Sequence, residues 1–274
     1  MISVPTIAAC CATLFVSLIL PVLVLILFAL KHRKQGIVSA WLLGAAGFFV
    51  TQILIRLPIL TALQSQGWFL AFAQNHLFAY AFSLAFTAGL FELAGRVAVA
   101  RLMHKRLTLR RSLAAGLGHG GIEAMLLIGI TYINNLVYIA MINSGTFDTI
   151  VAQTAALGVD VSQLELIRTQ LLSVSPALFL LAGLERILAM TGHVAMSLLV
   201  CYGVAHRKTG ICTLLCLGIH TLMDLTAGIS LVLPQSIAYP VIYAILIVMA
   251  AISLFVIREL TRRWKKEVSH DSEE

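Results

Sequence analysis

Residues 116–124 read GLGHGGIEA and stand at the start of a long apolar run. Three of the glycines satisfy the G-x-G-x-x-G spacing of a dinucleotide-binding loop, but such a loop follows a β-strand. The preceding residues, RLMHKRLTLRRSLAA, form a basic connector without a strand pattern, which excludes this interpretation. Glycines also let membrane helices approach closely, and His119 and Glu123, one turn apart, would then point into a shared interior. The stretch therefore predicts a membrane helix with a polar face.

The composition of the whole chain is that of a polytopic membrane protein. Of its 274 residues, 60% are hydrophobic and only 11% are charged, and a spanning helix needs about 20 mostly apolar residues. No basic segment or cleavage site precedes the first apolar run, so we expect a retained helix rather than a signal peptide. The sequence predicts an all-α bundle in a single transmembrane domain, 1–274. Its seven expected spans are 4–30, 37–60, 68–97, 112–142, 175–205, 209–232 and 235–258.

The distribution of Lys and Arg predicts the orientation of these spans. The connectors LQSQG and LPQSIAY carry no charge, whereas alternate connectors and the tail are basic, at 31–34, 101–111, 206–208 and 258–266. We therefore expect the N-terminus outside the cell and a basic cytoplasmic tail at about 259–274. The net charge of +7 would then reflect topology and contact with anionic lipids rather than nucleic-acid binding.

The connector at about 143–174 is expected on the outer side, with the motif-bearing core at about 85–230. In the connector, Ser162 precedes QLELIRTQLL and predicts the start of a short amphipathic helix on the membrane surface. Ser175 and Pro176 suit the cap and first position of the fifth span. The five cysteines show no disulfide framework and no CxxC pair that would support a thiolate metal site.

Ionisable side chains inside the spans are concentrated on the third to the sixth. A charged group in a bilayer is costly, so each marks a candidate functional site. With a rise of about 1.5 Å per residue, four of them lie at a similar depth, roughly 13–20 Å from the basic ends. These four are Glu92, Glu123, His193 and His220. Two carboxylates and two imidazoles at one level predict a metal site or a proton-handling site.

Zinc is the metal we expect, because it binds histidine nitrogens and carboxylate oxygens and leaves one position for water in catalytic sites. Glu123, His193 and His220 are the predicted ligands. His119 is expected as a further ligand or as a group that supports one.

Glu92, held by Arg96, is the predicted base that would deprotonate the bound water. Asp224, one turn beyond His220, would orient an imidazole or stabilise an oxyanion. A plain ion pair between Glu92 and Arg96 is the alternative. Glu185 and Arg186 are adjacent and not expected to face each other, and we interpret them as a supporting network.

Four elements in chain order, FELAGR, GLGHGGIEA, ERILAMTGH and HTLMD, resemble the YhfC family of intramembrane metalloproteases. That family is grouped with the CAAX-processing (CPBP) and PrsW-type membrane proteases. The resemblance covers about 85–230 and implies peptide-bond hydrolysis on membrane-embedded or prenylated substrates.

By that resemblance, Glu92 and Arg96 match an EExxxR element, Glu123 the acidic position of the second element, and His193 an isolated histidine. His220 and Asp224 match HxxxD. The chain departs from the pattern at Leu93, where many relatives carry a second glutamate.

An intramembrane endopeptidase of a bacterial plasma membrane is therefore expected, in which a carboxylate activates a water, with or without zinc. The glycine-rich face of the fourth span would leave room for the substrate backbone. The expected partners are membrane lipids and a membrane-embedded or lipidated substrate, not nucleic acid, and the oligomeric state stays open. Leu93 favours the alternative of a catalytically impaired scaffold or immunity protein. Intramembrane His, Asp and Glu also occur in proton-coupled transporters, although the chain shows no repeated halves.

Overall fold

The computed structural model describes the backbone of residues 1–270 and the side chains of residues 1–266. Within this part of the chain every regular element is a helix, which confirms the all-α prediction. Seven helical segments are long and apolar enough to cross a membrane, as predicted. They are Val4–Lys31, Ile37–Gln64, Leu77–Leu102, Leu109–Ser144, Pro176–Ala205, Thr209–Ile229 and Gln235–Lys266.

The third span begins later than the predicted residue 68. A separate short helix, α5 (Gly67–Asn75), precedes the spanning helix α6 (Leu77–Leu102). The backbone leaves the helical region at His76, where φ is −133° and ψ is 57°. The polar run Gln74-Asn75-His76 interrupts the apolar sequence at this point, and Asn and His are poor helix formers.

The chain forms two compact units, and a single transmembrane domain stays a prediction. Unit 1 comprises residues 1–22 and 124–187. Its apolar core includes Cys10, Tyr132 and Phe179. The Phe179 carbonyl accepts hydrogen bonds from Thr13 Oγ1 at 2.6 Å and from Tyr132 Oη at 3.1 Å. Its elements are α1 (Val4–Leu14), the π-helical η1 (Phe15–Ile19), η4 (Ala124–Gly129), α8 (Ile130–Ser144), α9 (Thr146–Ala156), α10 (Ser162–Ser173) and the first half of α11 (Pro176–Ala205).

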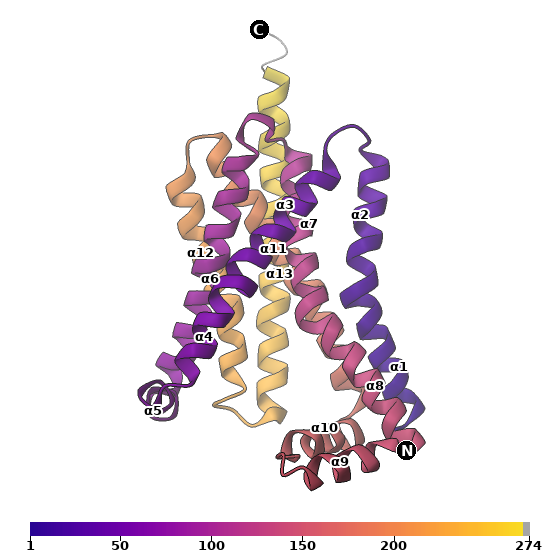
Figure 1. Ribbon diagram of the computed structural model, residues 1–274. Coiled ribbons are helices and arrows are strands. Elements are labelled where there is room, and N and C mark those ends of the chain that lie inside the picture. The colour runs from indigo at the N-terminus through magenta and orange to yellow at the C-terminus, as the bar shows by residue number, and fades with distance from the viewer. Residues whose placement is uncertain (271–274) are drawn as a thin grey trace. The chain divides into compact units, whose positions relative to one another are not determined.

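The connector of unit 1 holds two helices, α9 and α10 (Figure 1), of which only α10 was predicted. Helix α10 begins at Ser162, but its capping group is the carboxylate of Asp160. That carboxylate accepts hydrogen bonds from Ser162 N at 2.9 Å and from Ser162 Oγ at 2.8 Å. These two donors hold the pKa of Asp160 below its ordinary value, the backbone donor most strongly. Arg168 on α10 donates to Asp148 on α9 at 2.5 Å, which joins the two helices.

Unit 2 comprises residues 23–123 and the described residues from Leu188 onward. Its core is formed by small and branched residues such as Ala40, Ala114, Leu198 and Val200. Helix α3 packs along α7, and α6 packs along α12. Besides α5, α6 and the rest of α11, its elements are α2 (Leu20–Lys31), α3 (Ile37–Phe48), the π-helical η2 (Phe49–Arg56), α4 (Leu57–Gln64), η3 (His104–Arg106), α7 (Leu109–Glu123), α12 (Thr209–Ile229) and α13 (Gln235–His270).

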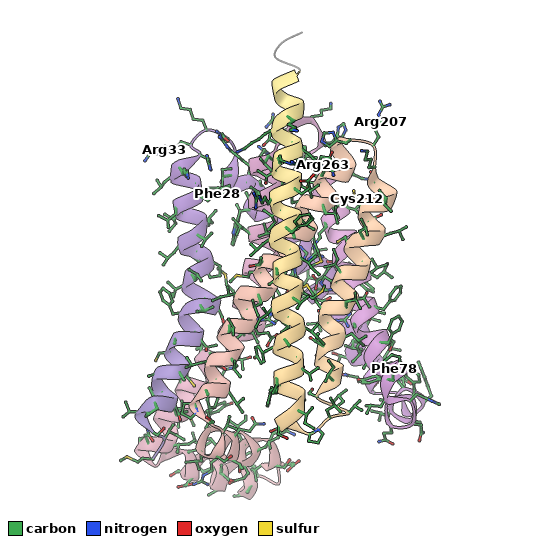
Figure 2. All side chains as sticks on the ribbon, turned by 180° about the vertical axis from the view of Figure 1, so that it is seen from behind. Phe28, Arg33, Phe78, Arg207, Cys212 and Arg263 are labelled. Atoms are coloured by element: carbon green, nitrogen blue, oxygen red, sulfur yellow. The ribbon has the colours of Figure 1, made fainter. Side chains whose placement is uncertain are left out.

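The basic connectors and the basic part of α13 lie at one end of the helices of unit 2. Figure 2 shows Arg33, Arg207 and Arg263 at this end and Phe78 at the opposite one. Arg33 follows α2, Arg207 lies between α11 and α12, and Arg263 belongs to α13. The helices therefore alternate in direction as the connector charges predict, while the side of the membrane that this end faces stays a prediction.

Candidate functional site

Four helices of unit 2 supply the candidate residues. Helix α6 carries Glu92 and Arg96, and α7 carries His119 and Glu123. Helices α11 and α12 carry the rest, which are His193, His220 and Asp224. The structure links all seven side chains through contacts within one unit, as the following distances show.

The glycines of α7 explain how these helices come close enough. A Cβ atom on Gly118 would meet the backbone carbonyl of Trp41 on α3. Gly116 and Gly120 face α11 instead. A Cβ on Gly116 would lie 2.7 Å from the Cα of Val194, and one on Gly120 would lie 2.8 Å from the Cβ of His193. Missing side chains thus allow α7 to pack between α3 and α11. The space at Gly116, Gly118 and Gly120 is filled by α3 and α11, so these three positions leave no room for a substrate backbone.

The carboxylate of Glu92 is the centre of the site. Its Oε2 lies 2.8 Å from His220 Nε2 and 3.0 Å from His119 Nε2. Arg96 Nη2 donates to the same oxygen at 3.3 Å. Only 3% of Glu92 is exposed. A carboxylate buried this deeply needs such polar partners, because burial without them is costly.

Two histidines each lie between Glu92 and a second carboxylate. His193 Nδ1 is 3.8 Å from Glu92 Oε2, and its Nε2 is 2.8 Å from Glu123 Oε2. His220 Nε2 contacts Glu92 Oε2, and the Nδ1 of the same ring lies 3.4 Å from Asp224 Oδ2. The two outer carboxylate side chains are more exposed than that of Glu92, at 12% for Glu123 and 39% for Asp224 against 4%. Polar groups therefore lead outward from the buried centre in two directions.

Arg96 sets the hydrogen-bonding state of His193. Its Nη2 lies 2.7 Å from His193 Nδ1, and a guanidinium can only donate. Nδ1 is therefore the acceptor, and a neutral His193 carries its proton on Nε2, which faces Glu123. The Nε and Nη1 atoms of Arg96 and the Oγ of Ser197 have no hydrogen-bond partner among the described residues. They line a cavity of about 10 Å³, roughly the size of one water molecule.

Three buried residues can converge on a metal ion. Glu92, His119 and His193 each offer one ligand atom, and these atoms lie within 4.8 Å of one another. The imidazoles of His119 and His193 are stacked with their centroids 5.4 Å apart. A carboxylate and two imidazoles are a common donor set for divalent metals. The charges also fit, since three carboxylates and one guanidinium leave two negative charges when the histidines are neutral.

This group differs in part from the predicted ligand set. His119 and His193 belong to both. Glu92, predicted as the base, lies among the converging ligand atoms. Glu123 and His220, predicted as ligands, each contact a member of the group from outside it. No cysteine of the described residues belongs to the group, so Cys212 and Cys216 on α12 add no ligand to it.

The two residues expected as a supporting network, Glu185 and Arg186, belong to unit 1, so their support of the site in unit 2 stays a prediction. The Arg186 guanidinium donates to the Glu185 carboxylate. The expectation that the two side chains do not face each other was wrong, because they form an ion pair. Leu93 packs against the apolar core of unit 2, one position along from Glu92.

Sequence reasoning missed two residues that touch the site. Phe48 on α3 places its ring edge against His119, with the centroids 5.4 Å apart. No pattern distinguishes it from the other apolar residues of its span. Ser197, beside Arg96, follows His193 by four positions. That spacing places it on the same helix face as His193, which was a usable signal.

Comparisons with known proteins agree with this picture. Residues 16–248 match the model of a family described as YhfC intramembrane metalloprotease. The chain is 33% identical over 195 residues to a Bacillus subtilis (strain 168) protein named "Uncharacterized membrane protein YhfC". That alignment covers 70% of this chain and 73% of the relative. No solved structure matches. All seven candidate residues lie inside the segment that the family model matches.

Proposed function

Because the chain belongs to the YhfC intramembrane metalloprotease family, we propose that it hydrolyses peptide bonds of membrane-associated substrates at the cluster around Glu92. One observation carries the proposal. Residues from four membrane helices, among them three imidazoles and three carboxylates, meet around a carboxylate that is 3% exposed. Intramembrane ionisable groups are expensive, and this many together favour a catalytic role over packing.

The metal we propose is zinc, held by Glu92, His119 and His193. Their convergence within 4.8 Å supports this choice, together with the preference of zinc for imidazole and carboxylate donors. When bound, zinc supplies Lewis acidity that polarises a carbonyl and makes water a stronger acid.

The protein's own contribution is to hold protons beside the reacting bond. In hydrolysis, the water oxygen bonds to the carbonyl carbon, the C–N bond breaks, and a proton passes from the water to the leaving amine. Glu123 with His193, and Asp224 with His220, form two carboxylate–imidazole pairs next to Glu92. Each pair can take up a proton from the centre and return it.

Arg96 is proposed as a positioning residue. It contacts both Glu92 and His193 and so restrains two of the three residues that converge. Its guanidinium also offsets part of the negative charge of the site before substrate binds.

The experiment compares new peptide N-termini in vesicles. The wild type and Glu92→Gln are reconstituted with a bacterial membrane-protein extract and zinc, and newly formed amino termini are labelled and sequenced. We expect wild-type-dependent termini within or next to spanning segments and none with Glu92→Gln. His76→Ala, an exposed position outside the site, serves as the matched control and should behave as the wild type. Equal termini in wild type and Glu92→Gln would overturn the proposal and favour a non-catalytic scaffold.

A further inference from the structure

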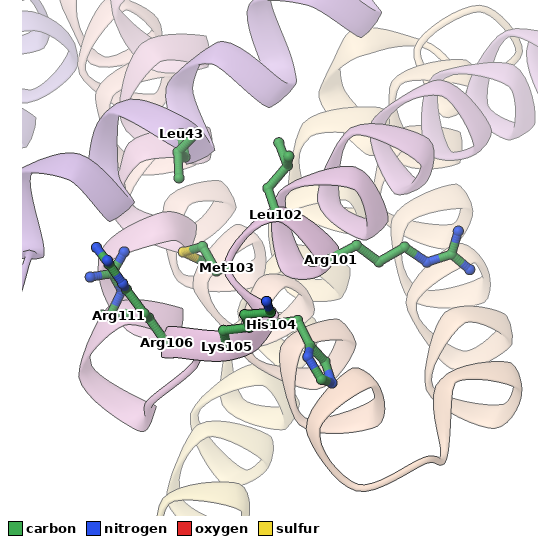
Figure 3. Close-up of a pocket in the computed structure, with 8 residues that line it drawn as sticks. All are labelled: Leu43, Arg101, Leu102, Met103, His104, Lys105, Arg106 and Arg111. Atoms are coloured by element: carbon green, nitrogen blue, oxygen red, sulfur yellow. The ribbon is translucent and has the colours of Figure 1, made fainter.

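A second polar feature of unit 2 is a cavity of about 650 Å³ at the basic end of the helices. It is formed by the end of α6, the turn η3 and the start of α7, with one residue from α3 (Figure 3). Four of the lining residues are permanent cations: Arg101, Lys105, Arg106 and Arg111. None of them takes part in the site around Glu92, and the volume is typical of ligand-binding cavities.

The residues that the structure describes do not neutralise the charges of this cavity. No ion pair joins any of the four cations to a carboxylate among the residues that the structure describes. The Nε atom of Arg111 is buried and has no hydrogen-bond partner there. The Arg111 guanidinium lies over Gly36, where a Cβ would collide with it. Buried donors usually have partners, so the lining points to an anionic ligand with oxygen acceptors.

Apart from the imidazole of His104, the rest of the lining is apolar, which restricts the kind of anion. Leu43, Leu102 and Met103 complete the cavity. Met103 is 2% exposed and Leu102 is 75% exposed. The cavity thus has a buried apolar side and an apolar rim. A small soluble anion gains nothing from this rim, whereas a lipid brings hydrocarbon to it.

The position along the helices agrees with a lipid. The cavity lies between Leu102, where one candidate span ends, and Leu109, where the next begins. Headgroup phosphates occur at this level of a bilayer. Basic pockets between spanning helices are a known mode of anionic lipid recognition.

We propose that this cavity binds an anionic phospholipid, with the headgroup phosphate on Arg106 and Arg111 and the acyl chain along Leu102. Arg106 and Arg111 are the central donors because Arg106 ends the turn η3 and Arg111 lies at the start of α7, whereas the Arg101 side chain extends away from them in Figure 3.

The test is native mass spectrometry of the detergent-solubilised full chain. It is titrated with phosphatidylglycerol and, in parallel, with phosphatidylcholine of the same acyl chains. We expect one phosphatidylglycerol to bind more tightly than phosphatidylcholine. The double variant Arg106→Ala/Arg111→Ala should weaken phosphatidylglycerol binding roughly 30-fold, because each cation near a lipid surface contributes about 1 kcal/mol. Lys105→Ala/Arg106→Ala leaves the packing of Arg111 on Gly36 untouched and should weaken binding similarly.

A charge-matched control separates the cavity from general attraction. Arg33 and Arg258 are exposed cations outside its lining, so Arg33→Ala/Arg258→Ala should keep wild-type binding. Equal affinity for the two lipids, or equal losses in the cavity and control variants, would overturn the proposal. Competition by inorganic phosphate or glycerol phosphate at concentrations similar to the lipid would identify a soluble phosphate site instead.

Discussion

His220 Nε2 lies 2.8 Å from Glu92 Oε2, although 128 residues separate them in the chain. The contact joins α12 to α6, two helices that pack along each other in unit 2. On the α6 side, Gly89 favours this approach, since a Cβ there would lie 3.2 Å from Leu217 Cδ1 and 3.3 Å from Thr221 Oγ1 on α12. The pair brings an imidazole to a buried carboxylate that also contacts His119 and Arg96. Every prediction about the site depends on this convergence.

Metal content is expected to depend on the converging group. Purified wild type should carry about one zinc per chain, and His119→Ala or His193→Ala should lose it because each removes a ligand. Elemental analysis by mass spectrometry measures this directly. His76→Ala removes an exposed imidazole and should leave the content unchanged. Retention of full zinc content in His119→Ala would contradict the ligand assignment.

The two outer carboxylates, Glu123 and Asp224, are expected to change the affinity for zinc without being required for zinc binding. Glu123→Gln and Asp224→Asn remove the partners of His193 and His220. Such supporting contacts typically change metal affinity about 10- to 100-fold. Competition with a fluorescent zinc chelator measures the change. Glu259→Gln alters a carboxylate on α13 that pairs with Arg262 and Arg263 and should have wild-type affinity. An unchanged affinity in Glu123→Gln would show that Glu123 does not support the zinc-bound imidazole.

The glycine packing predicts opposite results for two alanine substitutions. Gly118→Ala places a methyl group on the Trp41 carbonyl of α3, and overpacking of this kind costs about 1–3 kcal/mol. Its Tm should fall by several degrees. Gly218→Ala adds a methyl group in open space on α12 and should match or exceed the wild type, because alanine favours helices. Thermal unfolding in one detergent compares both, and equal stability of the two variants would refute the close approach of α7 and α3.

The cap of α10 predicts a local effect. Asp160→Ala removes the acceptor of Ser162 N and Ser162 Oγ, so deuterium uptake should rise at the start of α10. Uptake at the start of α9 should not change. Because the pKa of Asp160 is lowered in the folded protein, its stabilising contribution is present near neutral pH and is lost as the pH falls through that lowered pKa. Carbon NMR of the Asp160 carboxyl follows the titration, and an ordinary or raised pKa would contradict the cap.

Hydropathy and charge determined the fold class and the number of spans, because both depend on composition over about 20 residues. Short interruptions between helices were harder to predict. The interruption at His76 and the additional helix α9 are short features, and the polar residues that cause them resemble ordinary loop or interface residues.

The sequence by itself also determined which ionisable residues share one depth, because the rise of a helix is constant. Glu92, Glu123, His193 and His220 were selected in this way, and the structure links them through contacts. Only the tertiary structure decided that Glu92 is the centre, that Arg96 contacts His193, and that the basic turn encloses a cavity. The reason is that the rotation of each helix about its axis is set by packing between distant segments, such as that of Gly118 on Trp41.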